Sequence, residues 1–298
     1  MLTKLFKASI AKSTILVYKR AWAVYNQFHV NCISRFTHPY IPLSVSHIAS
    51  FIAYMHLSGY APSTQVTYIS SIGYLHKISS ATDPTKEFMI QKLLVGSFKI
   101  SPTIDNRLPI TLIVLFRLIE DMPHYVSSYY NRILLAAMFS VAFFGLFRIG
   151  ELTTSVHGEV MLHLNDLNYC QDHFAVSIKK YKHSKNTGSV SIPLYRHDNH
   201  TICPVKNMLQ YLEIRGYTPG PLFQFASGKA TVRSFFVKYL NLGIKFIGLQ
   251  SSLYKSHSFR IGGASYLAEL GLSDAQIRER GRWDSDAFKK YIRNLRVD

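Results

Sequence analysis

Acidic residues and cysteines are both scarce in this 298-residue sequence. It contains 17 Asp and Glu against 34 Lys and Arg, and no acidic residue precedes Asp83. Its three cysteines, Cys32, Cys170 and Cys203, lie too far apart in the sequence to form a disulfide framework or a pair of zinc ligands. This excludes a disulfide-stabilised secreted domain and fits a reducing compartment, which we expect to be the nucleus in a eukaryote and otherwise the cytoplasm.

Long hydrophobic runs are also missing. The longest uncharged apolar run, residues 133–147, is shorter than the roughly 20 residues that a membrane-spanning helix needs, and Arg148 follows it directly. We therefore expect a buried helix at this place. Neither the cysteines nor the carboxylates cluster at metal-ligand spacing, so we expect no metal and no other cofactor.

Positive charge and apolar residues are abundant. The formal net charge is +17 and 48% of the residues are hydrophobic, which is typical of a folded protein with a polyanionic partner. Nucleic acid is the leading candidate for that partner, ahead of a membrane surface, and we expect no membrane association.

The first 98 residues have the pattern of a helical domain. Apolar residues recur at helical spacing in three stretches that turn signals separate, which predicts about four short helices. These residues are Ile15, Tyr18, Trp22 and Tyr25, then Ile48, Phe51, Ile52 and Met55, then Val66, Ile69, Ile72 and Leu75. A merely solvated basic face is one interpretation, but the lack of any acid over 82 residues favours binding to a phosphate backbone. The start of one helix, at Ser63, Thr64 and Gln65, is our candidate for contacts to DNA bases.

A polar stretch, residues 99–109, interrupts the helical periodicity and is predicted to be a linker. Residues 1–106 carry a net charge of +7 and residues 107–298 a net charge of +10. Both flanks of the linker are therefore basic, and two basic domains could hold a duplex from opposite sides.

Residues 110–298 combine helices with a hairpin. Helical patterns cover residues 110–120, 131–152, 204–215 and 231–242, and three more helices are expected in the last 45 residues. Strict alternation predicts two strands joined by a polar turn. Their inward residues are Phe174, Val176 and Ile178 on the first strand and Val190, Ile192 and Leu194 on the second. The predicted fold class is mainly α with a small β-hairpin.

Two arginines are candidates for phosphate contacts. Arg148 ends the most apolar run, and Glu151 follows at a spacing that lets a carboxylate orient a guanidinium. His257 and Arg260 share one face at the start of a helix, where an imidazole and a guanidinium could clamp one phosphate. Either pair alone is equally consistent with an ordinary ion pair or solvated surface. Two glycines follow Arg260 and indicate a close approach of backbones.

The C-terminal region adds a basic turn and an aromatic residue. Arg282 and Trp283 form this turn, and a capped final helix is expected to hold Tyr291. A phenol is mostly protonated at neutral pH and needs nearby cations to act as a nucleophile, which Arg148 and Arg260 could supply. A half-buried structural aromatic is the alternative interpretation of Tyr291.

Taken in order, these residues and a hairpin lysine resemble the tyrosine recombinase (phage integrase) family over nearly the whole chain. The stretches at residues 108–111 and 281–288 are most similar to recombinases of eukaryotic Crypton-like and DIRS-like mobile elements. The resemblance implies a helical core-binding domain (residues 1–98), a linker (99–109) and an α+β catalytic domain (110–298). It also implies double-stranded DNA as partner and a homotetramer assembled on two sites.

The resemblance implies a role for each matched residue. Tyr291 would attack a DNA phosphodiester and form a 3′-phosphotyrosine, while the two arginines stabilise the phosphate and Glu151 supports the first of them. A lysine would protonate the leaving 5′ oxygen, and His257 and Trp283 would hold the phosphate. The matched catalytic set is Arg148, Lys182, His257, Arg260, Trp283 and Tyr291.

The lysine needs a further argument because the hairpin offers Lys179, Lys180, Lys182 and Lys185. If strand alternation continues past Ile178, Lys180 and Lys182 share the inward face, and Lys182 fits the family's distance into the turn better. We expect Lys179, Lys185 and Arg282 to contact DNA. Two alternatives remain: a type IB topoisomerase, which relaxes supercoils without joining two sites, and a domesticated DNA-binding protein without catalysis.

Overall fold

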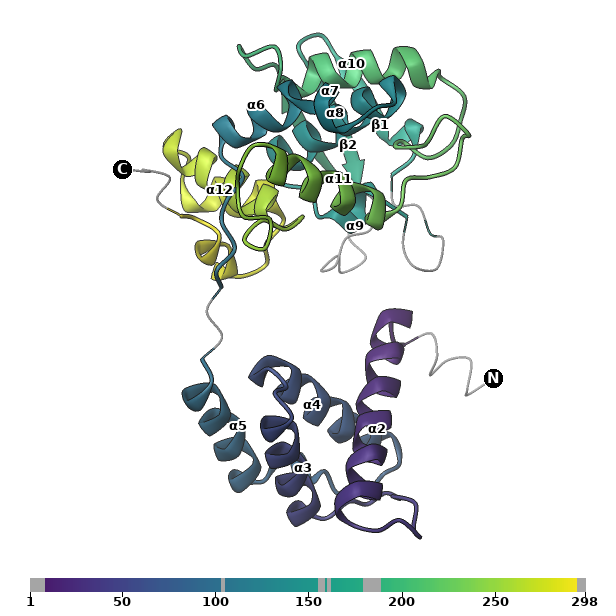
Figure 1. Ribbon diagram of the computed structural model, residues 1–298, viewed down its shortest axis with the longest axis vertical. Helices are drawn as coiled ribbons and strands as arrows, with labels where there is room; N and C mark the ends of the chain where they lie inside the picture. The colour runs from purple at the N-terminus through teal and green to yellow at the C-terminus, as the bar shows by residue number, and fades with distance from the viewer. Residues whose placement is uncertain (1–8, 103–104, 155–158, 160–161, 179–188, 294–298) are drawn as a thin grey trace. The chain divides into compact units, whose positions relative to one another are not determined.

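The computed structural model describes residues 9–102, 105–154, 159, 162–178 and 189–293. The chain divides into two compact units, Met1–Asp105 and Asn106–Asp298 (Figure 1). The division falls inside the stretch at residues 99–109 that the sequence assigns to a linker.

The first unit is a bundle of helices α2 (Lys12–Cys32), α3 (Val45–Leu57), α4 (Pro62–Ile78) and α5 (Phe88–Ile100), with a short 3-10 helix, η1 (Pro84–Lys86). The predicted helical spacing is confirmed for most of the apolar residues, which lie in or against one core, whereas Ile15, Tyr18 and Leu75 lie outside it and are half-buried. Tyr25, Ile48, Phe51 and Ile72 are fully buried in that core. Over the described residues of this unit, the prediction of about four short helices is therefore correct.

The second unit surrounds helix α8 (Tyr129–Phe144), whose residues from Leu134 to Phe143 are all buried. Its other helical elements are α6 (Leu112–Glu120), α7 (Met122–Tyr125), α9 (Ile149–Leu152), η2 (Leu164–Asp166), α10 (Pro204–Arg215), α11 (Arg233–Phe246), α12 (Ser258–Glu269), α13 (Asp274–Gly281) and η3 (Asp286–Lys290). Helices α10 and α12 pack against α8, so α12 is held on the central helix of this unit.

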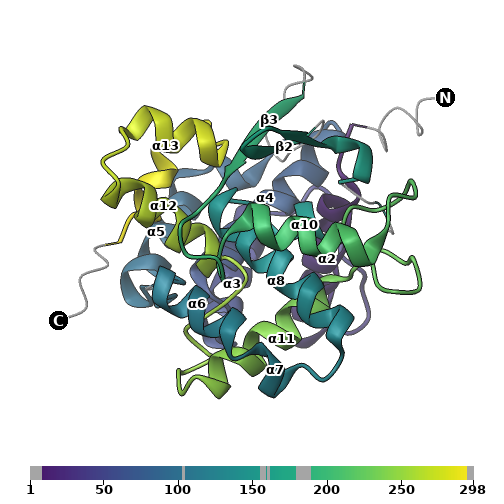
Figure 2. The same ribbon diagram turned by 90° about the horizontal axis from the view of Figure 1, so that it is seen from above.

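A three-stranded antiparallel sheet completes this unit, in the order β1 (Leu167–Cys170), β2 (His173–Ile178), β3 (Val190–Tyr195). Figure 2 shows β2 beside β3. The predicted hairpin is confirmed: Val176 lies opposite Ile192, and both are buried. Strand β1 was not predicted. Its residues are mostly exposed, so they lack the alternation that marks a half-buried strand.

The prediction of one helical run over residues 131–152 is wrong. Helix α8 ends at Phe144, and Leu146 adopts a left-handed backbone conformation with φ of 49°. Gly145 permits this break because it has no Cβ atom. In any other residue the Cβ atom would lie 2.3 Å from the ring of Phe147. Arg148 therefore does not end α8 but begins the separate helix α9 with extended backbone angles.

The expected helix around Tyr291 is also different. Residues Asp286–Lys290 form the 3-10 helix η3, which Ser285 caps, and Tyr291 directly follows it. A capping box between Ser273 and Gln276 starts helix α13. Within the described part of the chain, no helix is long and apolar enough to cross a membrane.

Candidate active site

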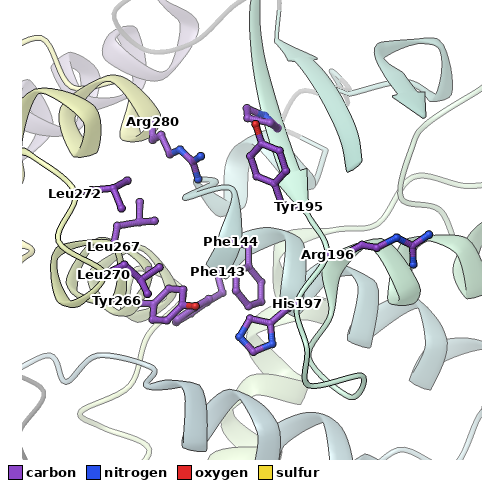
Figure 3. Close-up of a pocket in the computed structure, with 12 residues that line it drawn as sticks. Phe143, Phe144, Tyr195, Arg196, His197, Tyr266, Leu267, Leu270, Leu272 and Arg280 are labelled. Atoms are coloured by element: carbon purple, nitrogen blue, oxygen red, sulfur yellow. The ribbon is translucent and has the colours of Figure 1, made fainter. Parts of the chain in front are cut away.

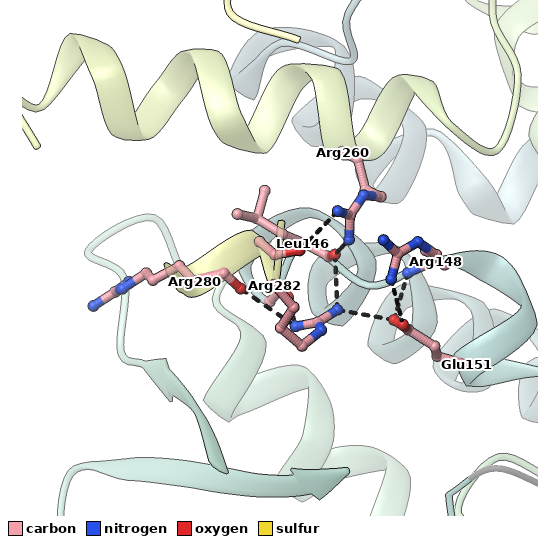
Figure 4. A network of polar contacts seen from close by, with 8 residues as sticks. Leu146, Arg148, Glu151, Arg260, Arg280 and Arg282 are labelled. Carbon is pink, nitrogen blue, oxygen red and sulfur yellow. Dashed lines mark hydrogen bonds and ion pairs between the residues drawn. The ribbon is translucent and has the colours of Figure 1, made fainter. Parts of the chain in front are cut away.

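Glu151 is the centre of a buried polar network (Figure 4). Its Oε2 atom accepts hydrogen bonds from the Arg148 backbone N–H at 2.8 Å and from Arg282 Nη2 at 2.9 Å. Its Oε1 atom accepts one from Arg148 Nη1 at 3.1 Å. One carboxylate therefore orients two guanidiniums that come from different parts of the sequence.

Arg260 is 1% exposed and lies on the first turn of α12. It donates to the backbone carbonyls of Leu146 and, at 2.8 Å, of Gly281. The break after α8 thus presents a carbonyl that fixes this arginine. Leu146 has a left-handed backbone conformation, and its carbonyl points toward the buried guanidinium of Arg260.

Burial and nearby charged groups change the pKa of Arg260. Burial, together with the positive charges of Arg148 and Arg282, lowers the pKa of Arg260 to about 9, while Glu151 and Tyr291 oppose the shift. At neutral pH Arg260 remains positively charged.

The predicted close approach at the two glycines of α12 is present. A Cβ atom on Gly262 would lie 1.7 Å from the carbonyl oxygen of Ile110, and one on Gly263 would lie 2.3 Å from that of Phe143. The second turn of α12, directly after Arg260, is therefore pressed against two backbones, which limits the movement of Arg260.

Three aromatic rings assemble beside Arg260. Its guanidinium lies over the Trp283 ring, 4.4 Å from the centroid, a cation–π arrangement. The Tyr291 ring lies 5.2 Å from the Trp283 ring and 4.8 Å from the His257 ring, measured between centroids. Tyr291 thus contacts both residues that the sequence pairs with phosphate binding.

The segment around Tyr291 is held by a residue that sequence reasoning missed. Ser265, buried on α12, accepts at Oγ from the Arg293 backbone N–H at 2.9 Å, and its one hydroxyl hydrogen is shared between the carbonyls of Ile261 at 2.9 Å and Tyr291 at 3.1 Å. A lone serine in a helix carries no sequence signal for such a role. Nearby, Trp283 and Phe288 belong to a small apolar cluster that also includes Leu146.

The structure therefore brings together Arg148, Glu151, His257, Arg260, Trp283 and Tyr291, all at the junction of α9, α12, α13 and η3. Lys179, Lys182 and Lys185 lie outside the described residues. Among the described residues, no group of three His, Cys, Asp or Glu side chains could hold a metal ion.

Comparisons with solved structures identify the fold. The chain is similar to a lambda integrase dimer bound to a COC′ core site, with a TM-score of 0.65 and 16% identity over 99% of this chain and 76% of the integrase. It is similar to XerH site-specific recombinase in a post-cleavage complex with palindromic difH substrate, with a TM-score of 0.65 and 17% identity over 94% and 76% of the two chains. The chain has the tyrosine recombinase fold.

A third structure supports this assignment. Tn1549 transposon integrase in complex with circular intermediate DNA matches with a TM-score of 0.67 and 14% identity, over 97% of this chain and 91% of that one. The mainly helical architecture with its small antiparallel sheet matches the core-binding and catalytic domains of lambda integrase. No protein-family model matches the sequence, and no curated protein sequence is significantly similar.

Within the tyrosine recombinase fold, two expected DNA contacts are not at the surface. Gln65 is fully buried and donates from Nε2 to the Tyr60 carbonyl at 2.8 Å, so its side chain is not free to reach DNA bases. The Arg282 side chain is only 1% exposed and is engaged by Glu151. Both expectations are therefore wrong for this conformation, whereas Ser63 is exposed and Thr64 is half-buried at the start of α4.

A separate pocket of about 260 Å³ lies between the end of α8, the end of β3 and α12 (Figure 3). Aromatic side chains line it, including Phe144, Tyr195 and Tyr266, and the Arg280 guanidinium lies over the Tyr195 ring. Its lining residues are not those of the predicted catalytic set, so this hollow is distinct from the candidate active site.

Proposed function

We propose that this protein is a site-specific DNA recombinase or integrase that cuts and rejoins DNA strands through a 3′-phosphotyrosine at Tyr291. One observation carries the proposal: Tyr291 packs on His257 and Trp283, and Trp283 in turn lies under the Arg260 guanidinium. The tyrosine recombinase fold and the net charge of +17 support DNA as the substrate.

The first chemical step is attack of the Tyr291 phenolate oxygen on a phosphodiester. A new O–P bond forms to tyrosine, the P–O5′ bond breaks, and the leaving oxygen takes a proton from Lys182. Arg148 and Arg260 stabilise the negative charge on the non-bridging oxygens because the protein scaffold holds their guanidiniums in place before DNA arrives.

The second step reverses the first with a different strand. A 5′-hydroxyl attacks the phosphotyrosine and gives its proton to the neutral Lys182, a new P–O5′ bond forms, and the bond to tyrosine breaks to release the phenolate with which the first step began. His257 and Trp283 flank Tyr291 and hold the phosphate. No nucleotide is consumed because the covalent link conserves the energy of the phosphodiester bond.

The biological setting belongs to the same proposal. The similarity to recombinases of Crypton-like and DIRS-like elements favours integration of a mobile element, catalysed by a homotetramer on two DNA sites. Lambda integrase has been crystallised as a dimer on a core site and as a tetramer on a Holliday junction, which supports oligomeric action on DNA.

The test is covalent trapping. A DNA site is selected from a random-sequence pool with the full-length protein and rebuilt as duplexes with single nicks at successive positions. Cleavage near a nick releases a short fragment, so the adduct accumulates and migrates as a slower band under denaturing conditions. We expect an adduct from the wild type, none from Tyr291→Phe, and unchanged binding in both.

A matched control is Tyr266→Phe, which removes a hydroxyl from a half-buried tyrosine of α12 outside the catalytic set. It should form the adduct at the wild-type level. An adduct from Tyr291→Phe would refute the assignment of Tyr291 as the nucleophile. Binding without any wild-type adduct would favour the domesticated DNA-binding protein, and relaxation of a plasmid that lacks the selected site would favour a topoisomerase.

A further inference from the structure

Arg282 occupies a backbone position that disfavours it. It ends α13 with φ of 56° and ψ of 48°, the left-handed conformation that glycine adopts without strain and that other residues seldom adopt. A long charged side chain at such a position is stable only if its own contacts compensate for the backbone cost.

The contacts of its guanidinium are extensive and buried. Nη2 donates to Glu151 Oε2 at 2.9 Å and to the Leu146 carbonyl at 3.1 Å. Nη1 lies 3.3 Å from the carbonyls of Gly145 and Arg280. The planar group also lies over the Phe147 ring, 5.1 Å from its centroid. Every one of these partners belongs to the break between α8 and α9, to α9, or to the end of α13.

These contacts connect the two halves of the candidate active site. Glu151 is the carboxylate that orients Arg148, and the Leu146 carbonyl is the group that also binds Arg260. Arg282 immediately precedes Trp283 in the chain. A displacement of this one guanidinium therefore affects Glu151 and both arginines, and it also moves the backbone that carries Trp283.

We propose that Arg282 is a positioning residue for DNA strand cleavage, and the proposal rests on the function proposed above. It acts through Glu151 and Leu146 to hold Arg148 and Arg260 in register with the segment that carries Trp283 and Tyr291. It does not bind the phosphate itself, because Nη1 and Nη2 of Arg282 each face two protein acceptors, whereas Nη1 and Nη2 of Arg260 each donate to one carbonyl.

The test measures single-turnover cleavage of the nicked selected duplex at saturating DNA, together with DNA affinity and the melting temperature. Arg282→Gly relieves the backbone strain and removes the guanidinium, whereas Arg282→Met keeps most of the side-chain volume. Arg282→Lys retains one charge that can reach Glu151 but not the fork of donors. The matched control is Arg278→Gln, which removes a positive charge from an exposed site on the same helix.

We expect the Gly and Met variants to cleave about 10- to 100-fold more slowly than the wild type, because displacing reacting groups by about 1 Å can cost a factor of about 100. The Lys variant should cleave at a rate between those of these two variants and that of the wild type. DNA affinity should change less than threefold in all three, and Arg278→Gln should match the wild type. A residue that served only folding would instead be tolerated as glycine.

A second measurement separates positioning from a general loss of stability. In Arg282→Met combined with Glu151→Gln, cleavage should be no slower than in the slower single variant, because both changes disturb the same contact to Arg148. If the rate losses of the two single variants instead multiply in the double variant, that result would overturn the inference. So would wild-type cleavage by any folded Arg282 variant, a loss of affinity that accounts for the rate, or failure of all three variants to fold.

The two proposals fail in different ways. If the wild type and Arg278→Gln form no adduct, the proposed recombinase function is refuted, and this inference is refuted with it. If both form the adduct and the Arg282 variants form it equally fast, only the role of Arg282 is refuted.

Discussion

Around Glu151, one carboxylate binds the guanidiniums of Arg148 and Arg282, and the guanidinium of Arg260 shares the Leu146 carbonyl with Arg282. Arg148, Arg260 and Arg282 all influence the same buried region, so the fixed charges of these four residues sum to +2. Burying cations costs free energy unless hydrogen bonds compensate, and here backbone carbonyls supply many of the acceptors. A region with excess positive charge, held in place by backbone, is suited to receive a phosphate whose negative charge increases during reaction.

The lysine that protonates the leaving oxygen can be identified chemically. Lys182→Ala should cleave an ordinary phosphodiester about 10²- to 10⁴-fold more slowly, the usual contribution of a general acid. A substrate with sulfur in place of the bridging 5′ oxygen has a leaving group that needs no proton. Lys182→Ala should therefore cleave that substrate at close to the wild-type rate.

Lys180→Ala and Lys185→Ala provide the comparison in the same assay. They should cleave the ordinary substrate at close to the wild-type rate, and sulfur substitution should increase that rate little. Sulfur rescue of either variant in place of Lys182→Ala would assign the proton to that lysine. Rescue of Lys180→Ala would contradict the argument from the family's distance into the turn, and rescue of Lys185→Ala would contradict the strand-alternation argument.

At this scale the sequence predicts residue types better than residue environments. The order and spacing of Arg148, His257, Arg260 and Tyr291 were sufficient to select them, and the structure gathers them. Arg282 was misjudged because a charged residue after a glycine is typical of an exposed turn. Its burial depends on acceptors that come from a distant break in the chain, which local patterns do not contain.

Among the elements, α12 is the one that the site depends on most. It presents Arg260 on its first turn and holds the Tyr291 segment through Ser265, and its two glycines let it contact neighbouring backbones. Since backbone atoms cannot move aside as a flexible side chain can, the glycines are required for close packing.

Gly262→Ala should therefore destabilise the second unit by about 1–3 kcal/mol or more, the typical cost of overpacking a core. Urea unfolding followed by the fluorescence of Trp283, in a Trp22→Phe background, reports on this unit because the chain has only these two tryptophans. Gly96→Ala is the control, because a Cβ atom there meets nothing within 4 Å.

The control substitution lies within α5 and should leave the Trp283 transition unchanged, while stabilising its own helix by about 0.5–1 kcal/mol. Equal stability of Gly262→Ala and the parent protein would show that the close approach to Ile110 is not maintained in solution.

Strong periodicity made some elements predictable. The residues of β2 and β3 alternate clearly, and α10 was predicted at residues 204–215, where the structure has it. The break between α8 and α9 was missed because residues 133–147 are continuously apolar. At the break the Phe147 ring packs over Gly145, a local contact that hydrophobic periodicity does not reveal.

For the whole chain, positive charge is the dominant property. The net charge of +17 is divided between the two sides of the linker, +7 over residues 1–106 and +10 over the remainder. The fold class followed from sequence because helical and alternating patterns occupy separate regions. The tyrosine recombinase fold was then confirmed by comparison of structures, at identities where sequence alone finds no match.

DNA binding by the full-length protein should depend steeply on salt. A protein that contacts six to ten phosphates loses about 10³- to 10⁵-fold in affinity between 50 and 200 mM salt, because binding releases counterions. We expect a loss in this range for the selected duplex, measured by fluorescence anisotropy. An affinity that stays within a factor of ten over this range would contradict a grip based on backbone phosphates.

The central claim is that Tyr291 becomes covalently joined to DNA, and mapping the linkage tests it most directly. The adduct formed on a nicked selected duplex is digested with nuclease and trypsin, and the peptide that retains a nucleotide is sequenced by mass spectrometry. We predict that the modified residue is Tyr291, carrying a 3′-linked nucleotide. A nucleotide on another tyrosine, or a 5′ linkage, would contradict the account.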